Sequence, residues 1–516
     1  MFYSHPEKMN EMEFSGDLNN FVSAHKYRVY APDDDLLNLI INSMVPKENR
    51  FPIGDLRLTE CRLPLPNKPQ PKVQIYVSTR DFMGTRTAMF GKTRLGKSNI
   101  VKLIAQSLIE TTKDIGNAGQ LIFDINGEYA NDNPQDDSRS LASAYKDHCI
   151  VYALTAKPMT PSRPLKLNFY EHPDRSRRVL AELLENEGRS SIYVKSFISV
   201  EIPSLESLKD LSINEKKRAA RRILMYWAIL KKAGYDINEA ELSKKLNFDL
   251  GFNSELRSAI YEDETPPNIN SLNALISELE KLSDFVRKKS DDDKILQSSS
   301  GNPLFQSDER ALLNFLKPTT GAGPAMIQRF RIYHDKNAGN FTQEIVKLLD
   351  TGKTVILDLG NANKEVMEYF SYELTNAIFN NQIDKFTTNA LGDHFVQLYF
   401  EEAHNLFPAK EDRDDIYRRI AKEGAKYHMG MVYSTQSVTS ISRDLLGQTE
   451  NFFIGHLSSQ DEVNALAKVN ISYESLKDDI LLAKTVGYVR MLTRSHRFVI
   501  PVQARKFMPS NQDKEE

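Results

Sequence analysis

Cysteine, one-sided charge and long apolar runs are all scarce in this chain of 516 residues. Its two cysteines, Cys61 and Cys149, exclude a disulfide framework and a cysteine-rich zinc module. Lys and Arg number 67 against 70 Asp and Glu, so no chain-wide positive field exists and any DNA contact must be local. No apolar run approaches the roughly 18 residues of a membrane span, and the first residues lack a signal-peptide pattern. We therefore expect a cytoplasmic protein with no membrane partner.

The rest of the composition, 40% hydrophobic and 27% charged, is typical of a folded globular protein with several domains. Short apolar runs alternate with amphipathic stretches in residues 81–163 and 331–483, which predicts one α/β core. Residues 164–330 are charged and helix-favouring, so we expect a helical insertion that splits this core. Residues 1–80 are predicted to form a small β-rich domain, because Pro64, Pro66, Pro69 and Pro71 favour extended edges. Residues 484–516 are expected to be a C-terminal extended segment with a fraying polar tail.

The strongest motif is GKTRLGKS, Gly91–Ser98, which matches G-x-x-x-x-G-K-[ST] between an expected strand and an expected amphipathic helix. The pattern suits a polyphosphate: glycines let backbone amides turn inward, Lys97 reaches the β and γ oxygens, and the Ser98 hydroxyl holds Mg²⁺. The N-terminus of the following helix adds partial positive charge. The alternative, a chance glycine-lysine turn, does not require that flanking strand and helix. We predict an ATP site formed by Gly91, Lys92, Thr93, Gly96, Lys97, Ser98 and Asn99.

A second acidic motif follows the apolar run VQLYF, which ends in Glu401 and Glu402. A strand in this position would present both carboxylates at its exit, beside the phosphate site. We assign Mg²⁺ binding to Glu401 and the polarisation of the attacking water to Glu402, because that water must be oriented in line with the γ-phosphate. Glu401 stands where Asp is commoner, so the division of labour between the two acids stays open. An acidic strand exit of no consequence is the alternative.

Two further strand ends are predicted to reach the same site. The run QLIFDINGEY places Asp124 and Glu128 after the strand that should follow the P-loop helix, where ligands gather at the carboxyl ends of parallel strands. Gln436 closes the run VYSTQ and is predicted to hydrogen-bond a γ-phosphate or water. The alternatives are an ordinary Asn-Gly turn flanked by acids and a loop or helix-cap amide.

With these motifs in order, the chain resembles the HerA-type ATPases of the FtsK-HerA superfamily. The resemblance runs from about Val73 to Pro501 through GKTRLGKS, FDINGEY, VILDLGN, FEEAHNLF, RRIAKEGAKYHMGMVYSTQ and IGHLSSQDEVNAL. It implies a RecA-like motor with a helical insertion, a small N-terminal barrel, a homo-hexameric ring and double-stranded DNA threaded through the pore. Such proteins typically work with a separate nuclease or a sirtuin-type effector subunit, in DNA end processing or anti-phage defence.

The sequence departs from the family pattern at two positions. Asn126 stands where His is more frequent, and Ala425 replaces an expected arginine. Catalysis at a ring interface needs a cation from the next subunit to stabilise γ-phosphate charge. The candidates, each of which is equally consistent with a solvated helix face, are Arg418, Arg419, Lys422 and Lys426.

Three functions are compatible with these motifs. The first is an ATP-driven translocase of double-stranded DNA, whose binding would be salt-dependent and largely independent of sequence. The second is an ATP-dependent ring scaffold that assembles and regulates a partner effector, and the third is a conjugation-type or single-strand motor. A basic cluster could contact DNA in the first, although an exposed helix face explains it better: Lys216, Lys217, Arg218, Arg221 and Arg222.

Overall fold

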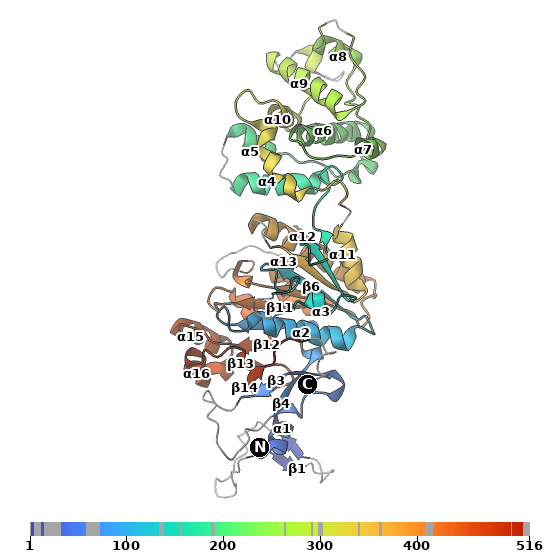
Figure 1. The fold of residues 1–516 in the computed structure, drawn as a ribbon. Coiled ribbons are helices and arrows are strands. Elements are labelled where there is room, and N and C mark those ends of the chain that lie inside the picture. Colours follow the sequence, from blue (N-terminus) through green and yellow to red (C-terminus); the bar gives the residue numbers. More distant parts are fainter. Residues whose placement is uncertain are drawn as a thin grey trace. The chain divides into compact units, whose positions relative to one another are not determined.

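The protein is described from a computed structural model, in which two compact units are distinguished (Figure 1). The first comprises Met1–Arg163, Thr342–Gly360 and Ser371–Glu516, and the second comprises Pro164–Phe341 and Asn361–Phe370. The proline-rich run of residues 58–72 and the tail of residues 509–516, for which extended edges and fraying were predicted, lie outside the described residues. The structure describes residues 2–4, 12–14, 32–57, 73–133, 139–154, 157–186, 191–262, 265–289, 293–297, 303–338, 341–360, 364–405, 407, 416–496 and 498–508.

The first unit is built on a sheet in which 12 described strands are hydrogen-bonded. Seven adjacent strands pair in parallel with their neighbours. Parallel strands need a crossover connection, which is usually a helix. This mixed α/β core confirms the predicted fold class. Across the sheet the order is β4 (Gln74–Ser78), β3 (Arg50–Leu56), β14 (Ile500–Ala504), β13 (Tyr488–Leu492), β12 (Asn451–Ile454), β5 (Arg86–Phe90), β11 (Met429–Thr435), β10 (Phe395–Phe400), β6 (Ala118–Asp124), β9 (Thr354–Asp358), β7 (Cys149–Ala153) and β8 (Arg163–Pro164).

On one side of this sheet the strands are antiparallel, and strands from the first 80 residues pair there with strands from the last 30. β13 pairs antiparallel with β12, β14 with β13, β3 with β14, and β4 with β3. The strands in the predicted N-terminal domain and those in the predicted C-terminal segment therefore hydrogen-bond in the same sheet as the core strands. A separate pair, β1 (Phe2–Ser4) and β2 (Met12–Phe14), is antiparallel.

The register of the parallel strands brings the predicted site residues together at the carboxyl ends of the strands. Phe400 of β10 lies opposite Phe123 of β6 and Tyr433 of β11, and Thr435 of β11 lies opposite Phe90 of β5. Each of these strands is buried almost throughout, as expected for a parallel sheet covered on both faces. The chain segments that follow β5, β11, β10 and β6 therefore start as neighbours.

Helices cover the strands of this unit, and one of them carries the predicted P-loop. α2 packs on β5, β6 and β11, and Ile100, Leu103, Ile104 and Leu108 of that helix are fully buried. Burial of such aliphatic side chains stabilises the fold by about 1.5–3 kcal/mol each before entropy is counted. The helices are α1 (Asp34–Asn42), α2 (Lys97–Thr112), α3 (Leu141–Ala144), α11 (Phe341–Asp350), α12 (Lys364–Thr387), α13 (Ile416–Glu423), α14 (Arg443–Gly447), α15 (Gln460–Val469) and α16 (Lys477–Leu482), with the 3₁₀ helix η10 (Ile471–Leu476). The first residue of α11 and residues 364–370 of α12 belong to the second unit.

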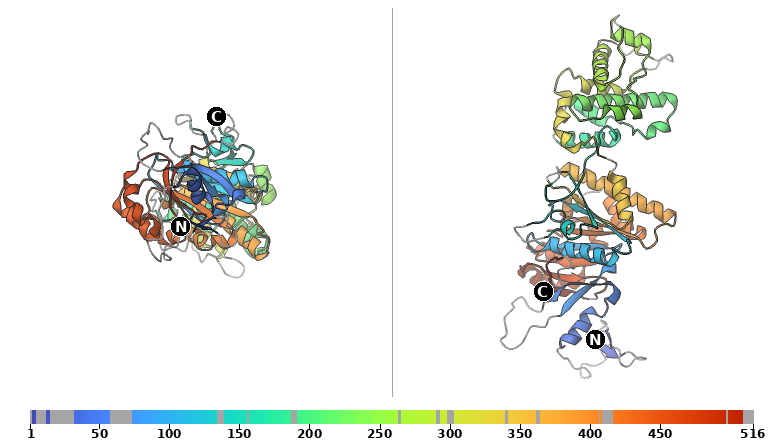
Figure 2. Two further views of the ribbon diagram at one scale, coloured as in Figure 1. Left: turned by 90° about the horizontal axis from the view of Figure 1, so that it is seen from below. Right: turned by 45° about the vertical axis from the view of Figure 1, so that its right-hand side comes forward.

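The second unit is almost wholly helical in its described part, and Figure 2 shows its helices from two further sides. α6 is its central helix and packs against α4, α9 and α10. A capping box at Ser212 and Glu215 starts α6, and its apolar stripe buries Trp227 completely. The helices are α4 (Pro173–Asn186), α5 (Ile192–Ser199), α6 (Ile213–Lys232), α7 (Glu239–Lys245), α8 (Ser254–Ile260), α9 (Leu272–Lys288) and α10 (Ser307–Leu316), followed by the 3₁₀ helix η7 (Gly323–Tyr333).

Candidate nucleotide site

The glycine-rich turn lies between β5 and α2, as its motif predicts. Gly96 has φ +94° at the N-cap of α2, and a Cβ there would lie 3.3 Å from the Gly487 nitrogen, so a side chain would be both strained and crowded. The backbone N–H of Gly91 donates to the Thr435 carbonyl oxygen at 3.2 Å, and that of Lys92 donates to the His456 carbonyl oxygen at 3.1 Å. The start of the turn is thus fixed by the neighbouring strand ends, which leaves the later amides for a phosphate.

The first turn of α2 contains Lys97, Ser98 and Asn99. The Asn99 side chain holds the C-terminal segment: its Nδ2 donates to the Arg505 carbonyl oxygen at 2.8 Å, and its Oδ1 accepts from the Phe507 N–H at 2.8 Å. Because both polar atoms of the Asn99 side chain are used in these bonds, its backbone is what could contact a nucleotide as predicted. Ser98 is half-buried and Thr93 is exposed, so both remain accessible to a ligand.

Lys97 and Glu402 come together across the strand ends. The Lys97 Nζ lies 3.8 Å from the Glu402 Oε1, and the two side chains are 10% and 21% exposed. Burial lowers the pKa of Lys97, and the nearby carboxylates of Glu402, Glu401 and Glu128 oppose that shift. The Nζ is buried and has no hydrogen-bond partner among the described residues. An ammonium in this state favours a further anionic ligand.

Glu402 is held in a strained backbone conformation. Its φ of +44° is rare for a residue with a side chain, and such positions cost on the order of 1–3 kcal/mol. The Gln436 Nε2 donates to the Glu402 Oε1 at 3.4 Å, and the His404 Nδ1 lies 3.4 Å from the Oε2. His404 was missed by the sequence reasoning, although it follows the two glutamates directly in the chain. Among the described residues, Gln436 is therefore the hydrogen-bond donor to the predicted base, and the His404 ring lies beside its other oxygen without a hydrogen bond to it.

Glu401 lies deeper than Glu402 and faces the other acids. It is 5% exposed, and burial raises its pKa well above the ordinary value, helped by the charges of Asp124 and Glu128. The Asn126 Nδ2 lies at 3.5 Å from its Oε2. A nearby divalent cation would reverse this shift, since it stabilises the ionised carboxylate.

The donor set fits Mg²⁺ of the kind that nucleotides carry. Carboxylate and hydroxyl oxygens, as in Glu401 and Ser98, are the hard ligands that this ion prefers, and it keeps several waters and substrate phosphates in its shell. Among the described residues no group of three or more His, Cys, Asp or Glu side chains is arranged as a metal cage. The residues present therefore suit an ion that arrives with a polyphosphate.

Asp124 and Glu128 behave differently from each other. The Asp124 carboxylate is fully buried and accepts the backbone N–H groups of Glu128, Tyr129 and Ala130 at 2.9, 3.0 and 2.8 Å. Burial raises the pKa of Asp124 to about 7, while these amides act in the opposite direction. Glu128 is exposed on the loop that Asp124 shapes. Of the two predicted ligands, Glu128 is the one whose carboxylate is open to a ligand.

The four candidate cations at residues 418–426 are not equivalent. Lys422 pairs with Asp444 at 3.0 Å, and the Arg419 guanidinium lies 4.8 Å from the centroid of the Phe379 ring. Lys426 lies 4.8 Å from the centroid of the Phe386 ring. For Arg418, the described part of the chain provides no ion pair or ring contact. Of the four, Lys422 is the one with a carboxylate partner among the described residues, so the charges of Arg418, Arg419 and Lys426 are not neutralised by an ion pair there.

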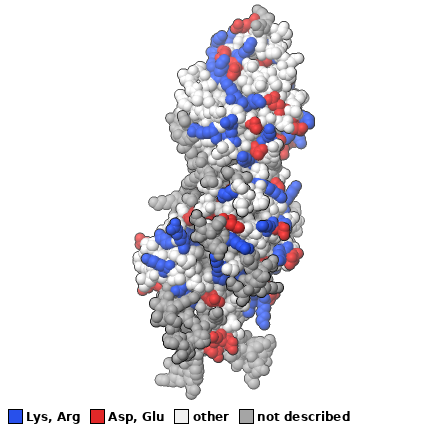
Figure 3. Space-filling view, in the orientation of Figure 1, with Lys and Arg blue, Asp and Glu red and all other residues white. Residues whose placement is uncertain are grey.

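The basic cluster on α6 is partly structural. Arg221 is buried and its Nε lies 2.5 Å from the Glu309 Oε1, and the Arg222 Nη1 lies 3.1 Å from the Asp308 Oδ2. Lys216 and Lys217 are exposed. On the face drawn in Figure 3, basic and acidic side chains are interspersed rather than gathered into one field. The cluster therefore offers fewer free charges than its sequence suggests.

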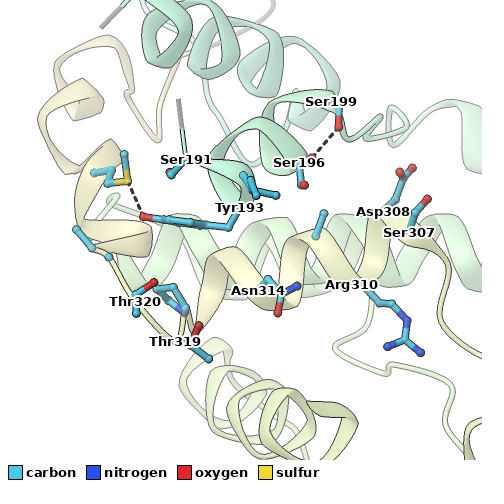
Figure 4. Close-up of a pocket in the computed structure, with 16 residues that line it drawn as sticks. Ser191, Tyr193, Ser196, Ser199, Ser307, Asp308, Arg310, Asn314, Thr319 and Thr320 are labelled. Atoms are coloured by element: carbon cyan, nitrogen blue, oxygen red, sulfur yellow. Dashed lines mark hydrogen bonds between the residues drawn. The ribbon is translucent and has the colours of Figure 1, made fainter. Parts of the chain in front are cut away.

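The second unit contains a groove of about 960 Å³ between α5, α10 and the loop before η7 (Figure 4). Seven of the 16 residues that line it carry a hydroxyl group, including Tyr193, Ser196 and Thr320, and none of the predicted site residues lines it. The Tyr193 hydroxyl donates to the Met326 Sδ at 3.2 Å and packs on Gly321, whose φ is +99°. This groove is a separate feature of the insertion.

A family model and several solved structures are similar to parts of this chain. A family model described as the central domain of the helicase HerA matches residues 65–310. Among solved structures, the chain is similar to the bacterial conjugative coupling protein TrwBΔN70, with 13% identity over 89% of this chain and 96% of that one, at a TM-score of 0.39. VirB4 of Thermoanaerobacter pseudethanolicus gives 11% identity over 90% and 98%, also at 0.39.

A more distant similarity is to the genome packaging NTPase B204 of Sulfolobus turreted icosahedral virus 2, with 12% identity over 33% of this chain and 74% of that one, at a TM-score of 0.25. These structural scores are too low to support a functional argument. No curated protein matches the chain. Among the described residues, no helix has both the length and the apolar character needed to cross a membrane. The matched part of the chain, residues 65–310, includes the glycine-rich turn and is similar to the central domain of the helicase HerA.

Proposed function

We propose that the chain hydrolyses ATP with Mg²⁺ at the edge of the sheet where β5, β11 and β10 end. The observation that carries this proposal is the approach of Lys97 to Glu402 beside the P-loop, with Gln436 bonded to the same carboxylate. The Lys97 ammonium is buried without a hydrogen bond to any described residue, which suits a γ-phosphate. The Glu402 carboxylate and the Gln436 amide lie together at adjacent strand ends, which suits an attacking water.

The roles follow from these positions. Lys97 stabilises the charge on the β and γ oxygens, while Gln436 and Glu402 orient a water in line with the γ-phosphorus. The water oxygen bonds to phosphorus, the bond to the bridging oxygen breaks, and the water proton passes to Glu402, so that ADP and phosphate leave. Ser98 and Glu401 would hold Mg²⁺, which neutralises phosphate charge when bound.

The proposal extends to the work done with this energy. We infer that six copies form a ring in the cytoplasm that translocates double-stranded DNA, and that a separate nuclease or sirtuin-type effector subunit acts with it in DNA end processing or anti-phage defence. The HerA family match supports this extension. Basic and acidic side chains are interspersed on the face drawn in Figure 3, which suits local contacts with phosphates better than a general basic field.

The test is the ATP turnover rate of the purified chain with and without linear duplex DNA, at matched salt, together with its mass in solution. Strong stimulation by blunt duplex in a hexamer-sized particle would support the translocase. Stimulation by single strands alone would favour a conjugation-type motor. Turnover that survives Lys97→Ala would contradict the ATP site itself.

A second candidate function is a ring scaffold that regulates a partner effector without processive pumping. The groove on the helical insertion favours this candidate, because it supplies a hydroxyl-bearing surface that the nucleotide site does not use. A hexamer whose ATP turnover is indifferent to DNA would support the scaffold over the translocase.

A further inference from the structure

A glutamate far from the P-loop in sequence binds the loop that follows Gln436. The Glu462 Oε1 accepts the Ser437 and Thr439 hydroxyls at 2.6 and 2.7 Å. Its Oε2 accepts the backbone N–H groups of Val438 and Thr439 at 2.5 and 3.1 Å. One carboxylate therefore receives four hydrogen bonds from three consecutive residues.

Glu462 is itself fixed at the start of α15. It lies in the first turn of that helix, and its backbone N–H donates to the Ser459 hydroxyl at 3.3 Å. Burial alone would raise the pKa of Glu462, but the hydroxyls of Ser437 and Thr439 and the two amides bring it below its ordinary value. The carboxylate is thus ionised near neutral pH, and charge-assisted hydrogen bonds of this kind are the stronger ones.

The same part of the chain also reaches the P-loop. The His456 carbonyl oxygen accepts the Lys92 N–H at 3.1 Å, and the His456 Nδ1 lies 3.0 Å from the Ile480 carbonyl oxygen. Residues 456–462 therefore contact the start of the nucleotide loop at one end and the segment after Gln436 at the other. Gln436 stands directly between β11 and the bound segment, and its amide reaches Glu402.

We propose that Glu462 is a positioning residue for Gln436. By fixing residues 437–439 it determines where the Gln436 amide lies relative to Glu402 and the attacking water. This inference rests on the proposed ATP hydrolysis and deepens it. Misplacing a catalytic group by about 1 Å can cost on the order of 100-fold in rate.

The test is a double-mutant cycle between Glu462→Ala and Gln436→Ala, read as kcat and KM for ATP. Glu462→Ala should lower kcat by about ten- to a hundredfold with little change in KM, since the P-loop is untouched. In the Gln436→Ala background, Glu462→Ala should cause no further fall. Multiplied losses in the double variant, or an unchanged kcat in the single one, would overturn the proposal.

Two conservative changes separate positioning from stability. Glu462→Gln should restore most of the rate, because its Oε1 can take the two amides while the hydroxyls rotate to accept from its Nε2. If Glu462→Ala does not fold, Ser437→Ala combined with Thr439→Val removes the two hydroxyl bonds and should lower kcat in the same direction. Unchanged kcat in that variant would also contradict the proposal. Asp461→Ala, exposed on the same turn, is the matched control and should leave kcat unchanged.

Hydrogen exchange supplies a readout that does not require turnover. Amides 436–440 should exchange faster in Glu462→Ala than in the wild type, and exchange in α2 should stay the same. Equal exchange at 436–440 would overturn the inference even if ATP is hydrolysed. Failure of the proposed function is recognised separately, as turnover that persists in Lys97→Ala.

Discussion

Two cation–carboxylate pairs, one in each unit of the molecule, show how differently the same chemistry is used. The Lys97 Nζ lies 3.8 Å from Glu402, with side chains 10% and 21% exposed, whereas the Arg221 Nε lies 2.5 Å from Glu309, with side chains 5% and 1% exposed. We call Lys97 and Glu402 the open pair, because they are farther apart and partly exposed to solvent. We call Arg221 and Glu309 the sealed pair, because they are in contact and buried. A ligand can therefore reach the charges of the first pair, whereas the side chains of the second contact each other and are closed to a ligand.

The surroundings of the two pairs sharpen this contrast. Glu402 has a left-handed backbone and lies at a strand end beside a glycine-rich turn, where strain and exposed amides are typical of a functional site. The Arg221 guanidinium lies beside the Phe252 and Phe305 rings, at 5.0 and 5.6 Å from their centroids. We therefore interpret the first pair as catalytic and the second as structural.

The largest effect is expected for Glu402→Gln. The amide keeps the shape of the carboxylate but cannot take the water proton, so ATP turnover should fall about 100- to 10,000-fold while ATP binding is retained. Single-turnover hydrolysis and equilibrium ATP binding measure the two steps. Normal turnover in this variant would contradict the assignment of the base.

The next effect is expected for Lys97→Ala. Loss of the ammonium removes charge stabilisation at the β and γ oxygens, so kcat/KM for ATP should fall about 100- to 1000-fold or become undetectable. Lys216→Ala, exposed on α6 in the other unit, is the control and should match the wild type. A Lys97 variant with wild-type kcat/KM would mean that the open pair is not a phosphate site.

Arg221→Ala should act on stability. It leaves Glu309 buried without its cation, which should cost about 3–5 kcal/mol in the free energy of unfolding. Trp227, the one tryptophan in the sequence, is buried in the same helix, so its fluorescence in denaturant reports this unit directly.

Two controls accompany this measurement. Arg221→Met combined with Glu309→Leu should recover most of the lost stability, because a well-packed apolar pair can replace a buried ion pair. Lys244→Ala removes an exposed pair with Glu241 and should leave the free energy of unfolding close to that of the wild type. A loss in Arg221→Ala as small as that would show that the sealed pair is not structural.

The smallest effect is expected for Lys216→Ala combined with Lys217→Ala. Both side chains are exposed, so the free energy of unfolding should change by about 0.5 kcal/mol or less. If they also lie away from bound DNA, the salt dependence of duplex binding should not change. If they bind phosphates instead, the slope of log K against log salt should become shallower by about 0.9 for each phosphate that the lysines neutralise, which would return this cluster to the DNA-binding surface.

The alternation of apolar and amphipathic segments predicts the α/β core. Motifs at the ends of the expected strands predict the site residues Lys97, Glu401, Glu402 and Gln436. The strand register then explains why these residues meet, since the ends of β5, β11, β10 and β6 are adjacent. The functional roles of these residues remain predictions that the variants above address.

Contacts between distant segments were not predictable from the sequence. The Asn99 amide is bound by Arg505, 406 positions away, and no local rule anticipates such a partner. The spacing of Ser459 and Glu462 matches a helix start, but it gives no sign that the carboxylate turns to residues 437–439. Arg221 was grouped with exposed basic residues because its carboxylate partner lies on another helix.

The most direct test of the contrast between the two pairs is the rise in melting temperature that saturating Mg·ATP gives to the wild type, Lys97→Ala and Glu402→Gln. A ligand that binds the native state but not the unfolded chain raises the melting temperature, and the rise grows with the logarithm of the ligand concentration divided by its Kd. We expect a clear rise for the wild type and for Glu402→Gln, and none for Lys97→Ala. An equal rise in all three proteins would contradict the claim that the open pair binds the nucleotide.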